Sequence, residues 1–206
     1  MKTLEEIKFH FENRSFFERM QFIDDYDFDD PFIEYYKDFI HKAVDVKHHL
    51  YLSDLIDLAR QLKIFDHDLY KRYFGYLFQK RHGIVKLSCL DYMIACPFFY
   101  QDEHAEKRLK KLLNNSLRAI IQNQVYLALI ALGTRNTEFY YKKFCESLAS
   151  TKDWRSLHRV LNKVSTAKKL KPYNSRVHEY LKNLSDQQDL GPGISERLAK
   201  HFEANS

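Results

Sequence analysis

The chain has 206 residues and a formal net charge of +5, with only five Gly and four Pro but 14 Tyr and 16 Phe. This composition excludes a collagen-like chain and a Pro/Gly-rich disordered one. Cysteines 89, 96 and 145 form no CxxC pair, which argues against a disulfide scaffold and a thiolate zinc site. The apolar runs suit neither a signal peptide nor a membrane span, so we expect a cytoplasmic globular protein that does not bind membranes.

Residues 1–70 are the acidic part of the chain, with 9 Lys and Arg against 16 Asp and Glu. The acid is densest in one short segment: Asp24, Asp25, Tyr26, Asp27, Phe28, Asp29 and Asp30. Five neighbouring carboxylates repel one another, so the folded chain must leave them in water or present them to a cation. Two interpretations stay open: a solvated loop before the helix that starts at Pro31, or a surface that binds a basic protein. The spacing of a calcium loop is absent.

Histidines raise the question of a metal site. His41, Asp45 and His48 have the i, i+4, i+7 spacing that would align them on one helical ridge. The HExxH and paired Glu-x-x-His patterns of known helical metal sites are absent. We therefore predict no metal and no other cofactor, and leave these three residues as an open alternative.

Between the sparse Gly and Pro residues, the apolar spacing is helical. One face is formed by Leu52, Leu55, Ile56, Ala59 and Leu62, and a second by Leu157, Val160, Leu161 and Val164. The segment 125–132 is apolar on every side, which predicts a helix surrounded by others. N-cap candidates are Ser53 or Asp54, Asp66, Asn115 or Ser116, Thr137 and Thr151. No long segment alternates with period two, so we predict an all-α fold of about ten helices.

When the sequence is aligned with itself at an offset of 34 residues, the same apolar pattern recurs three times. The superposed sets are Met93, Leu127 and Leu161; Tyr92, Tyr126 and Val160; and Cys96, Ile130 and Val164. A period of this length is typical of helix pairs that stack into a solenoid. From about Gly83 to Leu184 the chain therefore resembles HEAT-like helical repeats. The resemblance implies antiparallel helix hairpins stacked as a short right-handed α-solenoid, a binding scaffold that does not by itself name the partner.

The predicted organisation is a single all-helical domain over residues 1–206. Acidic helices occupy 1–70, the HEAT-like repeats occupy 83–184, and a capping helix closes the chain in 190–206.

Residues 71–206 are basic, with 24 Lys and Arg against 12 Asp and Glu. Arg155, Arg159 and Lys163 have the i, i+4, i+8 spacing of one continuous helical ridge, and nine Lys and Arg lie between Lys152 and Lys182. The other residues of this basic stretch that we single out are Trp154, Lys168, Lys169 and Lys171. A ridge of cations with an aromatic platform suits nucleic acid, and a solvated polar helix face explains it equally well.

No catalytic residue is predicted, because the chain contains no G-x-S-x-G, no P-loop and no G-x-G-x-x-G motif. The cysteines are interpreted as small core residues. The leading hypothesis is a non-enzymatic, protein-binding helical-repeat protein. In its specific form it is an immunity protein or inhibitor that uses the Asp24 to Asp30 segment to neutralise a basic effector such as a nuclease toxin. The alternative is a nucleic-acid-binding or DNA-processing helical-repeat protein that uses the Lys152 to Lys182 ridge.

Overall fold

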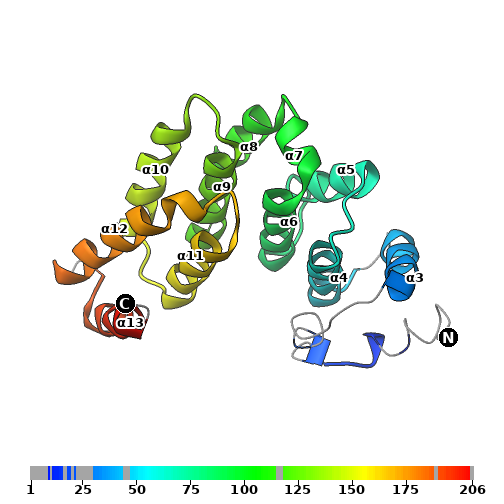
Figure 1. Cartoon of the computed structure of the whole chain (residues 1–206), viewed down its shortest axis with the longest axis horizontal. Coiled ribbons are helices and arrows are strands. Elements are labelled where there is room, and N and C mark those ends of the chain that lie inside the picture. Colours follow the sequence, from blue (N-terminus) through cyan, green and yellow to red (C-terminus); the bar gives the residue numbers. More distant parts are fainter. Residues whose placement is uncertain are drawn as a thin grey trace. The chain divides into compact units, whose positions relative to one another are not determined.

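The computed structural model describes residues 9, 11–15, 18–19, 21, 30–43, 47–114, 118–187 and 190–204. The regular structure of these residues is helical throughout, without a strand, which confirms the predicted all-α class (Figure 1). The chain divides into two compact units, 1–105 and 106–206. The helices are α3 (Asp30–Lys42), α4 (His49–Gln61), α5 (His67–Tyr76), α6 (Gly83–Ala95), α7 (Pro97–Gln101), α8 (Ala105–Leu113), α9 (Ala119–Leu132), α10 (Thr137–Ala149), α11 (Trp154–Thr166), the 3-10 turn η1 (Lys171–Tyr173), α12 (Asn174–Asp186) and α13 (Pro192–Ala204).

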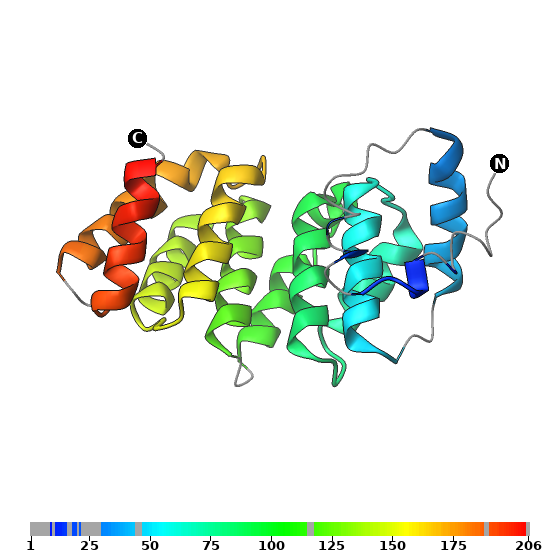
Figure 2. The same ribbon diagram turned by 90° about the horizontal axis from the view of Figure 1, so that it is seen from below.

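Helix α6 is the centre of the first unit. It packs mainly against α4, which lies beside it in Figure 2, and also against α5, while α3 packs on α4 and α5 on α7. Its residues are buried on most sides, including the fully buried Leu90 and Met93. The hydroxyl of Tyr92 donates to the carbonyl of Ile64 at 2.9 Å, so even the polar atom of this core residue is satisfied.

The first unit also contains a buried ion pair and a buried hydroxyl pair. Arg19 Nε lies 2.5 Å from Asp54 Oδ2, and both side chains are almost fully buried. Burial raises the pKa of Asp54 to about 6, although the hydrogen bond from Arg19 opposes the rise. The Ser53 and Ser88 hydroxyls are 2.8 Å apart and join α4 to α6. The predicted cap role of Ser53 or Asp54 is therefore wrong, because both face the interior of the unit.

Helix α9 has the corresponding position in the second unit. It packs against α10 and α11, and α12 packs against both α11 and α13. Residues 123–131 are all buried, which includes the predicted apolar segment 125–132 apart from the half-buried Leu132. Asn123 fits this interior because it donates to Thr151 Oγ1 at 3.1 Å and accepts from Ser147 Oγ at 2.6 Å.

The superposed apolar positions all lie on inward-facing sides of helices. All nine are buried, with exposures between 0% and 9%. They lie on α6 or at its C-cap, on α9 and on α11. The pattern therefore marks helix faces that turn toward the interior.

Helix starts differ from the prediction at several places. Asp66 caps α5 as predicted, accepting from the N–H groups of Asp68 and Leu69. Asp153 rather than the buried Thr151 caps α11. His48 and His82 cap α4 and α6 through their Nδ1 atoms. Asn115 and Ser116 lie outside the described residues, and Thr137 is the first residue of α10 without capping it.

Two glycines should respond to alanine in opposite directions. Gly75 is the residue before the last of α5, its φ is not positive, and an added Cβ would have no neighbour within 4 Å. Gly75→Ala should raise the free energy of unfolding by about 0.5–1 kcal/mol, because alanine loses less backbone entropy. Gly133 ends α9 at φ 66°, so Gly133→Ala should lower that free energy by about 1–2 kcal/mol. Urea unfolding followed by far-UV circular dichroism measures both changes in the free energy of unfolding. Changes of the same sign for the two variants would contradict the backbone conformations described for Gly75 and Gly133.

Candidate functional site

Helix α11 carries the basic ridge on the side away from the core. Leu157, Val160, Leu161 and Val164 are 0–2% exposed, so they fix which face of the helix turns inward. Arg155 is exposed, and Arg159 and Lys163 are half-buried. Lys168, Lys169 and Lys171 follow the end of the helix and are exposed. With a rise of about 1.5 Å per residue, the ridge runs for about 20 Å from Trp154 toward this lysine group.

The start of the ridge is held by Asp153. Its carboxylate accepts from the N–H groups of Arg155 and Ser156, both at 3.2 Å, and from the Ser156 hydroxyl at 2.7 Å. These hydrogen bonds, led by that from the Ser156 hydroxyl, hold the pKa of Asp153 below its ordinary value. The cap fixes the first turn of α11, where Trp154 and Arg155 lie.

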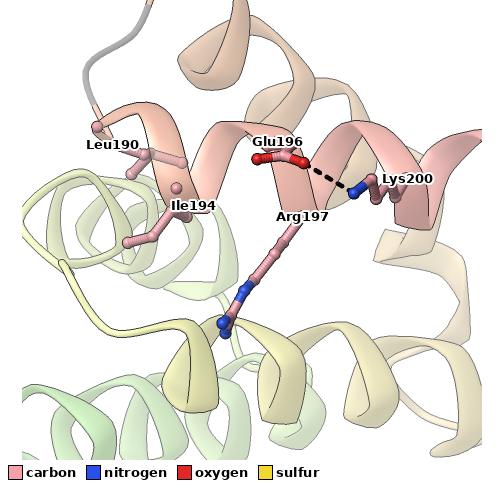
Figure 3. A pocket seen from close by; sticks show the side chains of 7 residues that line it. Leu190, Ile194, Glu196, Arg197 and Lys200 are labelled. Atoms are coloured by element: carbon pink, nitrogen blue, oxygen red, sulfur yellow. Dashed lines mark hydrogen bonds and ion pairs between the residues drawn. The ribbon is translucent and has the colours of Figure 1, made fainter.

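Arg197 of α13 adds a cation to this end of the ridge. Its guanidinium carbon lies over the Trp154 ring, 6.0 Å from the centroid. Figure 3 shows the side chain extending from α13 toward α11. The indole also contacts His158, with 5.8 Å between ring centroids. Sequence reasoning missed Arg197 because only the packing of the C-terminal helices brings it to Trp154.

A hollow of about 540 Å³ lies beside Arg197 at the start of α13. Leu190 and Ile194 form its apolar part, and Lys200 and Glu196 form its charged part (Figure 3). Lys200 Nζ and Glu196 Oε1 are 2.7 Å apart, so this lysine is already paired with a carboxylate. Arg197 is thus the cation that links the hollow to Trp154.

Arg176 belongs to a different surface, although the sequence places it in the same basic stretch. It donates two hydrogen bonds of 2.9 Å to the carboxylate of Glu138 on α10. Its guanidinium carbon is 4.0 Å from the Tyr141 ring centroid and 5.5 Å from that of Tyr173. Arg176 holds the pKa of Glu138 below its usual range. Phe139, the next residue, is 57% exposed. We call Glu138, Phe139, Tyr141, Tyr173 and Arg176 the Arg176 surface.

The acidic segment lies largely outside the described residues. Nothing is described for residues 24–29, and for Asp30 only the backbone that begins α3. The role predicted for Asp24, Asp25, Tyr26, Asp27, Phe28, Asp29 and Asp30 therefore stays a prediction.

The alignment of His41, Asp45 and His48 on one ridge is wrong, because α3 ends at Lys42 and His48 caps α4. His41 Nε2 instead lies 2.7 Å from Asp66 Oδ2, and Asp45 is outside the described residues. In the part of the chain that the structure describes, no three His, Cys, Asp or Glu side chains are grouped to hold a metal ion.

The cysteines are core residues, as predicted. Cys89, Cys96 and Cys145 are free and buried. Burial raises the pKa of all three thiols, so none is activated as a thiolate nucleophile.

No known protein family, curated protein sequence or solved structure matches this chain. Within the described residues, no helix combines the length and the apolar character that crossing a bilayer requires. The interpretation of the surfaces therefore depends on their own chemistry.

The Asp153 cap gives a prediction with a defined pH dependence. At neutral pH, Asp153→Ala should lower the free energy of unfolding by about 1 kcal/mol, whereas Asp153→Asn, which keeps a capping oxygen, should lower it by less. The pKa of Asp153 is lower in the folded state than in the unfolded state. Its negative charge therefore stabilises the fold fully above the unfolded-state pKa, and this stabilisation is lost as the pH falls through the folded-state pKa. The difference between the native protein and Asp153→Asn should therefore shrink in acid. Denaturant titrations at neutral and acidic pH measure it, and a constant difference would contradict this role.

Proposed function

We propose that this chain is a non-enzymatic binding protein built from stacked helix hairpins, and that its partner is another protein. The proposal takes α4 and α5, α6 and α7, α9 and α10, and α11 and α12 as successive hairpins. It is supported by packing between their first helices, α4 with α6 and α9 with α11. Packing also joins second helices, since α5 packs on α7 and Tyr180 of α12 donates to the Cys145 carbonyl of α10 at 2.8 Å. Such nearest-neighbour packing is typical of helical repeats. In this proposal the hairpins form a short right-handed, HEAT-like α-solenoid.

The Arg176 surface is the main evidence that the partner is a protein. Arginine and aromatic residues are the types most enriched where protein interfaces have their strongest contacts. The Arg176 side chain is 45% exposed, yet Glu138 and two tyrosine rings hold its position. A side chain that is already ordered loses little conformational entropy on binding. Phe139, the chain neighbour of Glu138 on α10, adds an exposed aromatic ring that contacts Tyr140.

If the protein is an inhibitor of a basic effector, the binding surface is instead the acidic segment from Asp24 to Asp30. Five carboxylates within seven residues would attract a cationic effector and accelerate its association. This inhibitor form predicts a partner with a basic surface, whereas the Arg176 surface selects for aromatic and hydrogen-bonding contacts.

Site-specific photo-crosslinking tests the protein partner. A photoreactive phenylalanine analogue replaces Phe139, and the matched control replaces Phe78, which is 43% exposed. In native lysate we expect one protein to crosslink at position 139 and not at 78, and unlabelled protein to compete with it. Equal crosslinking at both positions, or no competition, would count against the Arg176 surface.

Affinity measurements with that captured protein then test single contacts. Arg176→Ala should weaken binding at least tenfold, which corresponds to about 1.4 kcal/mol. Arg176→Lys should weaken it nearly as much, because lysine lacks the planar fork that pairs with Glu138 and stacks on tyrosine. Lys182→Ala, an exposed cation on the same helix, is the control and should bind normally. If all three bind alike, the Arg176 surface is not the contact.

The same assay decides on the inhibitor form. Replacing Asp24, Asp25, Asp27, Asp29 and Asp30 by Asn removes five charges with little change of shape. In the inhibitor form this variant should associate more slowly, lose much of its salt dependence and bind at least tenfold more weakly. Circular dichroism confirms that the variant folds. Unchanged affinity would exclude the acidic segment as the binding surface.

A further inference from the structure

We propose that the α11 and α13 surface binds single-stranded nucleic acid, with one base held between Trp154 and Arg197. This surface is formed by other residues than the Arg176 surface, and the inference does not depend on the protein partner proposed above. Three observations carry it: the spacing between the indole and the guanidinium, the cations beside them, and the adjoining hollow.

The first observation is the geometry of Trp154 and Arg197. The guanidinium carbon lies 6.0 Å from the indole centroid, which is wider than direct stacking. Flat groups in contact are about 3.5 Å apart, so a base between two such groups needs about 7 Å. To admit a base, the Arg197 side chain would therefore move away from the ring, by about 1 Å where the guanidinium lies directly above the ring centre. Unpaired bases stack on aromatic rings and on arginine planes in this way.

The second observation is the charge that continues from this base site. Arg155 is the neighbour of Trp154 on the same helix, and the ridge continues through Arg159 and Lys163 toward the exposed Lys168. Residues 106–206 contain 19 Lys and Arg against 9 Asp and Glu, so this unit attracts polyanions. A phosphate backbone running along the ridge would place successive charges near successive cations.

The third observation is space beside Arg197. The hollow of about 540 Å³ offers room for the sugar and phosphate of the clamped nucleotide. Its apolar side chains, Leu190 and Ile194, suit a sugar edge, and the lining also includes Lys200, paired with Glu196. The site should prefer single-stranded nucleic acid. Bases within a duplex are stacked on one another and cannot insert between Trp154 and Arg197.

Intrinsic fluorescence gives a direct readout, because Trp154 is the only tryptophan of the chain. Titration with single-stranded oligothymidine should quench this fluorescence as a base stacks on the indole. Heparin, a polyanion without bases, serves as the control and should bind the ridge without the same quenching. Equal quenching by heparin, or tight binding of a duplex without quenching, would overturn the base site.

Matched variants separate the base contact from the phosphate contacts. Arg197→Gln should remove most of the quenching while changing the salt dependence little. Replacing Arg155, Arg159 and Lys163 by Gln should lower the slope of log affinity against log salt by about 2, since each lost phosphate contact contributes about 0.7. Replacing the exposed Lys107, Lys110 and Lys111 of α8 by Gln removes the same charge elsewhere in the unit and should change the slope little.

The measurement for these variants is the anisotropy of a labelled oligonucleotide at several salt concentrations, with circular dichroism as the control for folding. Should the triple ridge variant fold poorly, Arg155→Gln alone tests the same point at one contact. Equal losses in the ridge and α8 variants would mean non-specific attraction to a basic unit, and would overturn the proposal. Oligothymidine that neither quenches Trp154 nor binds in low salt would do the same.

Discussion

The fold depends on two helices that must be covered on almost every side. Nine of the 13 residues of α6 and ten of the 14 residues of α9 are buried, so neither helix can face water on more than a narrow strip. Isolated helices of 13 or 14 residues are only marginally stable in water, and packing supplies most of their stability. The neighbours of α6 and α9 are therefore required: α4 and α5 around the first, α10 and α11 around the second.

Buried polar groups then fix how these neighbours pack. Asn123 of α9 reaches the end of α10 through Ser147 and Thr151, and the hydroxyl pair of Ser53 and Ser88 joins α4 to α6. Sliding one helix past the other would leave these atoms without partners, at a cost of about 1–3 kcal/mol for each buried group. The apolar residues thus determine that the helices pack, and a few polar residues determine where.

The sequence predicted the features that depend on one helix at a time. The buried face of α11, the ridge of Arg155, Arg159 and Lys163, and the Asp66 cap all follow from local spacing. Features that need two distant segments were missed. Arg176 pairs with Glu138, Arg197 reaches Trp154, and Asp54 meets Arg19, and no local pattern marks these partners. The histidine caps were missed for another reason, since histidine is outside the usual set of N-cap residues.

The interactions that stabilise the fold are different from those that determine the chemistry of the surface. The core contributes through buried area and satisfied polar atoms, whereas Glu138, Arg176 and Lys200 are largely exposed, and exposed ion pairs contribute about 0–1 kcal/mol. The exposed charges can therefore change at little cost to folding, because the core supplies most of the stability. For this chain, Arg176 lies on α12, whose residues Val177, Leu181 and Leu184 are buried and which packs against both α11 and α13. The packing of these buried residues thus supports α11 and α12 together, whereas the exposed charges determine the surface chemistry of each helix.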